Sequence, residues 1–298
     1  MLVIVAPGQG AQTPGFLSPW LEIPAFRDRI SAWSDIAGLD LASYGTTAGA
    51  DEIRDTAVAQ PLLVAAALAS FETLGVRPDL VAGHSVGEFA AAAIAGVLTA
   101  EQALSLVRER GLAMAKAASV TATGMSAVLG GAEDEVLAAL DRHGLTPANI
   151  NGAGQIVAGG TLERLEAFAA DPPARARVRS LAVAGAFHTV HMAPAVDHLR
   201  AEAATVTPAE PSITLLSNAD GAAVDAGGEF LQRLVTQVAS PVRWDACMAT
   251  MAERGVTTMI ELLPGGTLTG LAKRAMPGVR TVALKTPADL DTAKEVLG

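Results

Sequence analysis

Short apolar runs alternate with longer helical patterns along most of the chain. The runs that predict buried strands are rich in valine, isoleucine, leucine and alanine, and turn-forming residues bound most of them. They lie at residues 1–7, 79–83, 213–216, 258–262 and 279–284. Because strands that alternate with helices build a mostly parallel sheet, this pattern predicts an α/β fold.

The segments between these strands carry helical patterns. Thr99 and Gln102 predict a capping box, and Pro61 is expected in the first turn of a helix that is apolar almost all round. In the helix that follows Thr99, Arg110 and Met114 are four residues apart and therefore share a face. The predicted helices cover residues 24–33, 62–69, 99–118, 191–204, 229–238 and 267–275.

From residue 125 the rhythm changes to short strands and short helices. Strand, helix, strand, strand, helix and strand are predicted in turn, which is the order of a ferredoxin-like unit. Their ranges are 126–129, 133–142, 148–151, 155–159, 161–170 and 177–183. We therefore expect a ferredoxin-like small domain at 121–189, inserted into a large domain made of 1–120 and 190–298.

The stretch Gly83-His84-Ser85-Val86-Gly87 joins a predicted strand to an alanine-rich predicted helix. Gly-x-Ser-x-Gly in that position is typical of a nucleophile elbow, a tight turn that exposes the serine hydroxyl. The free N–H groups at the start of the helix would point to Ser85, where the oxyanion of an acyl transfer forms. The large domain is therefore predicted to be α/β-hydrolase-like. The alternative is a glycine-rich turn with an incidental serine.

Composition and charge exclude several classes of function. The chain has 298 residues, half of them hydrophobic, which is ample for a sizeable core. Its formal net charge of −10 argues against nucleic-acid binding. The single cysteine, Cys247, excludes an internal disulfide and a cysteine-rich metal site. With no basic leader and no apolar run long enough to span a membrane, we expect a soluble, cytoplasmic protein.

A serine nucleophile needs a base, and the chain offers five histidines. His84 is adjacent to Ser85 and would project in a different direction, whereas His188 lies where the predicted insertion rejoins the large domain and suits the wall of a cleft. The last acid before His188 is Asp171, beside two prolines, so no carboxylate is well placed for a triad. A dyad whose histidine is oriented by a backbone carbonyl is therefore expected.

Six separated motifs occur in one order along almost the whole chain. They are Pro7-Gly8-Gln9-Gly10-Ala11-Gln12, Gly83-His84-Ser85-Val86-Gly87-Glu88, Arg110-Gly111, Gly185-Ala186-Phe187-His188, Gln237 with Ser240-Pro241-Val242-Arg243-Trp244, and Pro264-Gly265-Gly266-Thr267-Leu268-Thr269-Gly270-Leu271. Together they resemble the bacterial malonyl-CoA:acyl-carrier-protein transacylases. Two positions depart from the pattern of that family: Thr189 replaces a common serine, and residues 151–154 lack an expected proline.

The resemblance implies a reaction and a role for individual residues. Malonyl would pass from malonyl-CoA to Ser85, with His188 as base, and then to the phosphopantetheine thiol of acyl carrier protein. It implies no metal and no cofactor. We expect a monomer with no nucleic-acid or membrane partner. The remaining roles are an oxyanion hole from the backbone N–H groups of Gln9 and Val86, a carboxylate partner in Arg110, a His188-orienting carbonyl in Gln237, and an acyl pocket from Phe187, Met114 and His84.

Several points stay open at this stage. A serine esterase or thioesterase would use the same pair of residues, and a catalytically silent scaffold would retain the same fold. The carrier could belong to fatty-acid or polyketide synthesis. Because the chain and its expected carrier are both acidic, docking would need a local basic patch. The candidates are Arg175, Arg177, Arg179, Lys116, Lys273 and Arg274.

Overall fold

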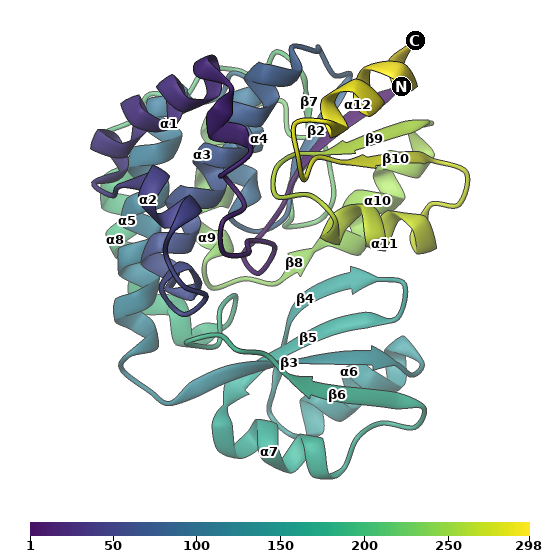
Figure 1. Cartoon of the computed structure of the whole chain (residues 1–298). Helices are drawn as coiled ribbons and strands as arrows, with labels where there is room; N and C mark the ends of the chain where they lie inside the picture. Colours follow the sequence, from purple (N-terminus) through teal and green to yellow (C-terminus); the bar gives the residue numbers. More distant parts are fainter.

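A parallel five-stranded sheet forms the centre of the larger part of the molecule (Figure 1). The computed structural model describes all 298 residues. The strand order is β10-β9-β1-β2-β7, and every neighbouring pair is parallel. The strands are β1 (Leu2–Ala6), β2 (Leu80–Gly83), β7 (Thr214–Leu215), β9 (Thr258–Glu261) and β10 (Arg280–Ala283).

The register of β1 and β2 places two predicted motifs side by side. Ala6 pairs with Gly83, so the loop that follows β1 and the elbow that follows β2 leave the sheet at the same edge. In parallel sheets, ligands bind in the crevice outside the carboxyl ends of the strands. The fold therefore brings Gln9 and Ser85 to the position where a site is expected.

Alternation along β1 explains how both faces of this sheet are covered. Ile4 and Ala6 join the core shared with one group of helices, whereas Val3 and Val5 pack with α10 and α11 on the other face. The first group comprises α1 (Pro24–Ala37), α2 (Leu41–Thr46), α3 (Thr56–Leu74), α4 (Gly87–Ile94), α5 (Ala100–Ala118), α8 (Ala193–Ala203), α9 (Gly227–Gln237) and α12 (Asp289–Leu297). On the other face lie α10 (Trp244–Glu253) and α11 (Thr267–Ala275). The predicted α/β fold class is confirmed.

Helix α3 starts earlier than predicted. It begins at Thr56, and the Asp55 side chain caps it by accepting from Ala57 N, so Pro61 lies inside the helix and not in its first turn. The prediction was wrong because the helix begins at the polar N-cap Asp55, several residues before the apolar run. By length and composition α3 could also cross a membrane, contrary to the expectation that no run was long enough. However, 78% of its most apolar 18-residue segment is buried in the protein, as in a core helix.

A second sheet lies beside the larger part of the molecule (Figure 1). Its own strands are β3 (Thr123–Gly130), β4 (Thr146–Gly152), β5 (Gln155–Thr161) and β6 (Ala176–Ser180), with α6 (Glu133–Arg142) after β3 and α7 (Leu162–Ala170) after β5. The order β6-β3-β5-β4 and the antiparallel pairing agree with the predicted ferredoxin-like unit. The boundaries 121–189 stay a prediction.

A two-residue strand ties the second sheet to the rest of the chain. β8 (Val242–Arg243) pairs in parallel with β4, and Arg243 N donates to Asn218 O at 2.8 Å. The sequence predicts no strand here, because a strand of two residues has no periodicity and exists only through its distant partner. Single turns of 3₁₀ helix occur at Trp20–Glu22, Glu52–Arg54 and Val190–Met192. The last of these replaces the start of the helix predicted at 191–204.

Candidate active site

The turn around Ser85 has the geometry of a nucleophile elbow. Ser85 has φ of 53°, a left-handed conformation that is strained for a residue with a side chain. A Cβ on Gly83 would lie 2.0 Å from the Gly87 carbonyl carbon, and one on Gly87 would lie 2.3 Å from Ala6 O. Both glycines are therefore required by close backbone approach, as the sequence motif predicts.

Ser85 and His188 are in direct contact at the mouth of this turn. Ser85 Oγ lies 2.6 Å from His188 Nε2, and His188 Nδ1 lies 2.8 Å from the backbone oxygen of Gln237. Because a carbonyl can only accept, Nδ1 carries the proton and Nε2 is free to accept the serine proton. Burial, and then the positive charge of Arg110, lower the pKa of His188 to about 3, so the imidazole is neutral at neutral pH.

Two backbone N–H groups beside Ser85 have no acceptor within the protein. They belong to Val86, which precedes the first residue of α4, and to Gln9 in the loop after β1. The Gln9 side chain is held by Thr56 Oγ1, which donates to it at 2.9 Å, and it donates to Arg54 O at 3.2 Å. Free N–H groups at such a turn are the donors that an oxyanion requires.

Arg110 is buried, with 1% of its surface exposed. Its Nη1 donates to Gln60 Oε1 at 2.5 Å and its Nη2 donates to Gln237 Oε1 at 2.8 Å, whereas its Nε has no acceptor. Burial lowers the pKa of Arg110 to about 10, against the opposing effect of the Glu88 carboxylate, so the guanidinium remains charged at neutral pH. A buried cation with unused donors is a ready partner for an anionic ligand.

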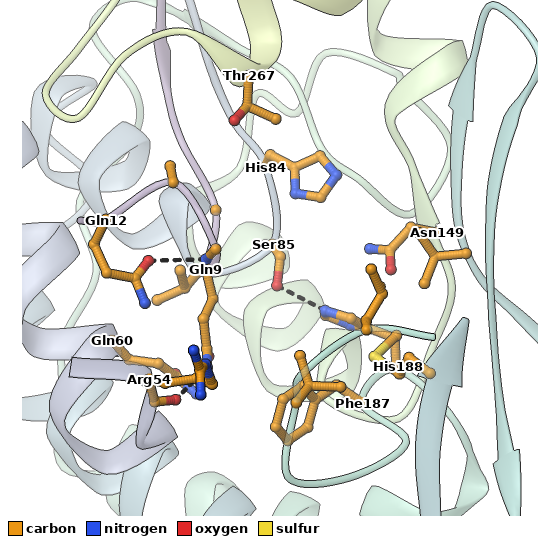
Figure 2. A pocket seen from close by; sticks show the side chains of 18 of the residues that line it. Gln9, Gln12, Arg54, Gln60, His84, Ser85, Asn149, Phe187, His188 and Thr267 are labelled. Carbon is orange, nitrogen blue, oxygen red and sulfur yellow. Dashed lines mark hydrogen bonds between the residues drawn. The ribbon is translucent and has the colours of Figure 1, made fainter. Parts of the chain in front are cut away.

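These groups line a single cavity of about 550 Å³ between the two sheets. In Figure 2, Ser85 points to His188, and Gln9 lies across the cavity from that histidine. Of the nine predicted site residues, eight line the cavity: Gln9, His84, Ser85, Val86, Arg110, Met114, Phe187 and His188. The ninth, Gln237, lies behind it and reaches His188 through its carbonyl.

His84 makes contacts that separate it from the reacting serine. Its Nε2 lies 2.9 Å from Asn151 Oδ1, and its ring meets the ring of Trp244 edge-on at 5.7 Å between centroids. Burial lowers the pKa of His84. As expected from its place in the elbow, His84 is a wall of the cavity and not the base.

Three polar residues that hydrogen-bond to residues of the site were missed at the level of sequence: Gln60, Glu88 and Asn218. Asn218 Oδ1 accepts from Ser85 N at 2.7 Å, and Asn218 Nδ2 donates to Gly83 O at 2.7 Å, which ties both sides of the elbow together. A polar residue inside an apolar stretch was the available signal for Gln60 and Glu88. Asn218 gave none, because Ser85 and Gly83, the residues that it joins, are 133 and 135 residues away.

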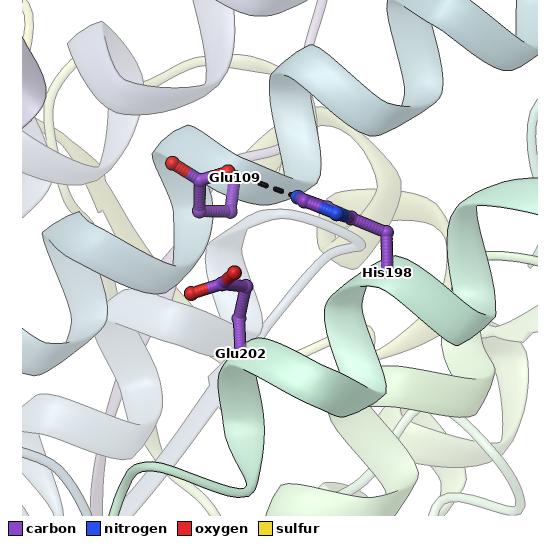
Figure 3. A group of neighbouring side chains, drawn as sticks. All are labelled: Glu109, His198 and Glu202. Atoms are coloured by element: carbon purple, nitrogen blue, oxygen red, sulfur yellow. Dashed lines mark hydrogen bonds and ion pairs between the residues drawn. The ribbon is translucent and has the colours of Figure 1, made fainter.

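A separate cluster of three titratable side chains lies on the surface between α5 and α8 (Figure 3). Glu109, His198 and Glu202 place their side-chain oxygen and nitrogen atoms within 4.8 Å of one another. His198 Nε2 lies 2.9 Å from Glu109 Oε2, and both side chains are partly exposed. This hydrogen bond accounts for the cluster as a contact between the two helices.

Comparison with known proteins places the chain in a family. Residues 3–287 match the family described as acyl transferase domain. The chain belongs to the acyl transferase family. Among related members, malonyl CoA-acyl carrier protein transacylase of Mycobacterium tuberculosis is 56% identical over 297 residues, which are 98% of each chain. The protein of that name from Escherichia coli is 32% identical over 303 residues, again 98% of each chain.

Solved structures of the acyl transferase family have the same fold. The crystal structure of MCAT from Mycobacterium tuberculosis superposes with a TM-score of 0.95 at 55% identity, covering 98% of this chain and 99% of that one. A type II PKS acyl-carrier protein in complex with its malonyl-transacylase gives a TM-score of 0.93 at 30% identity, covering 99% of both chains. The combination of an α/β-hydrolase-like and a ferredoxin-like part is therefore shared across this family.

Proposed function

We propose that this enzyme transfers a malonyl group from malonyl-CoA to the phosphopantetheine thiol of acyl carrier protein. One observation carries the choice of acyl group: a buried, charged Arg110 with unused donors lines the same cavity as the Ser85–His188 pair. An acetyl group would leave that charge unmatched, whereas the free carboxylate of malonyl would pair with it. The names of the related transacylases and of the carrier complex support the same choice.

In the first half of the proposed cycle, His188 Nε2 accepts the proton of Ser85, and Ser85 Oγ attacks the thioester carbonyl. The resulting oxyanion accepts hydrogen bonds from the backbone N–H groups of Gln9 and Val86, each worth on the order of 10²–10³ in rate. The carbon–sulfur bond then breaks, and His188 gives the proton to the leaving thiolate, which departs as the thiol of coenzyme A. The product is a malonyl ester on Ser85.

In the second half the carrier thiol attacks this ester by the reverse steps. His188 accepts the thiol proton and returns it to Ser85 Oγ as the carbon–oxygen bond breaks. Throughout, the Gln237 carbonyl keeps the His188 proton on Nδ1, which leaves Nε2 available for both halves. The acyl group moves between sulfur and oxygen without any redox change, so the cycle as proposed needs no cofactor and no metal.

The remaining walls define the acyl pocket. Phe187 and Met114 are buried hydrophobic residues on the cavity wall, and His84 is fixed there by Asn151. We propose that they enclose the malonyl methylene, so that an added methyl group would be disfavoured by about 1–3 kcal/mol. Exclusion of acetyl is the stronger selection, because it concerns a buried charge.

Carrier docking needs a cationic surface, because the chain as a whole is acidic. The six basic residues predicted from the sequence are all exposed, and none of them forms an ion pair: Lys116, Arg175, Arg177, Arg179, Lys273 and Arg274. Charges left free in this way favour an acidic partner. We place the reaction in the cytoplasm and the enzyme as a monomer, with these residues as candidate contacts for the carrier.

The direct test is to mix the protein with malonyl-CoA and holo acyl carrier protein and to identify the product by mass spectrometry. A transacylase produces malonyl-loaded carrier and free coenzyme A in equal amounts. A thioesterase with the same Ser85–His188 pair would release free malonate and leave the carrier unloaded, which would overturn the proposal. The Ser85→Ala variant is the matched control and should give neither product above background.

A further inference from the structure

Glu88 is a buried acid that the proposed reaction does not use. It is the second residue of α4, 1% exposed, and it does not line the active-site cavity. Its Oε1 accepts from Asn218 N at 2.6 Å, and its Oε2 accepts from Gln237 Nε2. Because both oxygens accept from N–H donors, the ionised carboxylate is the form that fits this arrangement.

The Gln237 side-chain amide lies between this carboxylate and the guanidinium of Arg110. Gln237 Nε2 donates to Glu88, and Gln237 Oε1 accepts from Arg110 Nη2 at 2.8 Å. A rotated amide would direct its N–H groups at the cation and its oxygen at the anion, and both contacts would be repulsive. Gln237 Nε2 also donates to Ser85 O at 3.1 Å, and the charge of Glu88 adds to this contact in determining which end of the Gln237 amide meets Arg110.

The orientation of this amide matters for the substrate. Gln60 and Gln237 each supply one oxygen to the guanidinium, and these two hydrogen bonds fix the plane of the fork. A guanidinium binds a carboxylate well only when its donors are aligned in that plane. If the Gln237 oxygen turned away, Arg110 would lose one of its two positional restraints.

We propose that Glu88 is a positioning residue for malonyl selectivity: its negative charge holds the Gln237 amide with its oxygen toward Arg110, and so keeps the guanidinium aligned for the substrate carboxylate. This inference rests on the proposed function. Glu88 touches no reacting atom. Its hydrogen-bonded path to Arg110 runs through the Gln237 side chain, whereas His188 is oriented by the Gln237 backbone carbonyl.

A second cavity gives Glu88 its own route to solvent. It measures about 450 Å³ and is lined by Glu88 and Gln237 together with Arg233 and Arg243. Arg110 from α5 and Arg233 from α9 both favour the ionised carboxylate, and the Cys247 thiol from α10 also lies within its electrostatic reach. Burial outweighs these cations and raises the pKa of Glu88 to about 8. The carboxylate can thus exchange protons without passing through the active site.

The test compares the wild type with Glu88→Gln, which keeps the shape and removes the charge. Malonyl-CoA and acetyl-CoA compete for Ser85 in a single turnover, and intact-mass spectrometry gives the ratio of the two acyl-enzymes. At about pH 9, where the Glu88 carboxylate of the wild type is ionised, the malonyl-to-acetyl ratio should be roughly 10- to 100-fold lower in Glu88→Gln, the effect of losing a hydrogen bond to a charged group. The acetylation rate should stay within about twofold, because the Ser85–His188–Gln237 backbone relay is intact. Glu101→Gln, at an exposed position in the first turn of α5, is the control for charge loss.

A purely structural role would give a different result. Equal losses of malonylation and acetylation in Glu88→Gln, or an unchanged ratio, would overturn the inference. If Glu88→Gln folds poorly, Glu88→Asp serves as a second variant, because it keeps the charge. Glu88→Asp must then retain a higher malonyl-to-acetyl ratio than Glu88→Gln. In the wild type the ratio must rise with pH through about 8, and a flat profile would contradict the proposal. If the wild type forms no malonyl-enzyme at all, the proposed function fails. If the wild type forms malonyl-enzyme and Glu88→Gln has the same malonyl-to-acetyl ratio, only this inference is refuted.

Discussion

Ser85 Oγ and His188 Nε2 lie 2.6 Å apart, although 103 residues separate them in the chain. Both residues have a positive φ, 53° for Ser85 and 60° for His188. A strained backbone of this kind persists only where the surrounding structure holds it in place. At Ser85 the hold is the Asn218 side chain, and at His188 it is the paired contacts to the Gln237 and Val238 carbonyls.

The rate of acyl-enzyme formation should remain high below the ordinary pKa of histidine. Only neutral His188 can accept the serine proton, and burial keeps its pKa at about 3 in place of 6.5. As pH falls, activity should therefore be retained through pH 6.5 and decline only well below it. The measurement is kcat/KM for malonyl-CoA between about pH 4 and 8, and an acid limb centred near 6.5 would contradict this environment for His188.

Asn218→Ala should weaken the elbow. The change leaves Ser85 N and Gly83 O without their buried partners, and each unsatisfied group costs about 1–3 kcal/mol. We expect a lower free energy of unfolding in urea and slower acylation of Ser85. Asn218→Asp retains the acceptor for Ser85 N and should lose less of the acylation rate. If Asn218→Ala matched the wild type in both measurements, the bracing role of this side chain would be wrong.

Stability should fall as pH rises from 6.5 to 8. Folded Glu88 keeps its proton up to about pH 8, whereas the unfolded chain releases it near 4.5, so the folded state binds more protons between these values. Stability therefore decreases with pH in that range, by up to ~1.4 kcal/mol per pH unit. Below 6.5 the lowered pKa of His188 acts in the opposite direction, because the unfolded chain then binds more protons.

In this window Glu88→Gln isolates the contribution of Glu88, because the lowered pKa values of His84 and His188 affect the variant and the wild type alike. Unfolding in urea at several pH values measures the slope, and Glu88→Gln should remove it. A Glu88→Gln protein with the wild-type slope would show that another group is responsible. The exposed variant Glu101→Gln should behave as the wild type does.

Much of the fold and the centre of the site could be predicted from the sequence. The elbow, the capping box at Thr99 and the order of elements in the second sheet are local patterns, and the structure contains each of them. His188 could be chosen because the other histidines lie at helix ends, on a helix or beside the nucleophile. That the Gln237 backbone carbonyl orients His188 could be predicted only from the family resemblance.

The rest depends on contacts between distant segments. β8 exists because β4 lies beside it, and Glu88 is buried among Asn218, Gln237 and Arg110, which come from three other elements. In the sequence Glu88 is simply an acid at the start of a helix, where a solvated position near the positive end of the helix dipole is the usual expectation. Its place behind the active site follows from the tertiary packing of α4, α5 and α9.

The proposed role of Arg110 is central, because the buried guanidinium is proposed to select malonyl. The most direct measurement is the competition of malonyl-CoA and acetyl-CoA for Ser85, followed by intact-mass spectrometry, in the wild type and in Arg110→Ala. The wild type should form almost only malonyl-enzyme, and sites built on such pairing can discriminate by roughly 10⁴–10⁵. Arg110→Ala should lose malonylation, and its acetylation should rise relative to its malonylation. An Arg110→Ala protein that still preferred malonyl over acetyl would contradict the account.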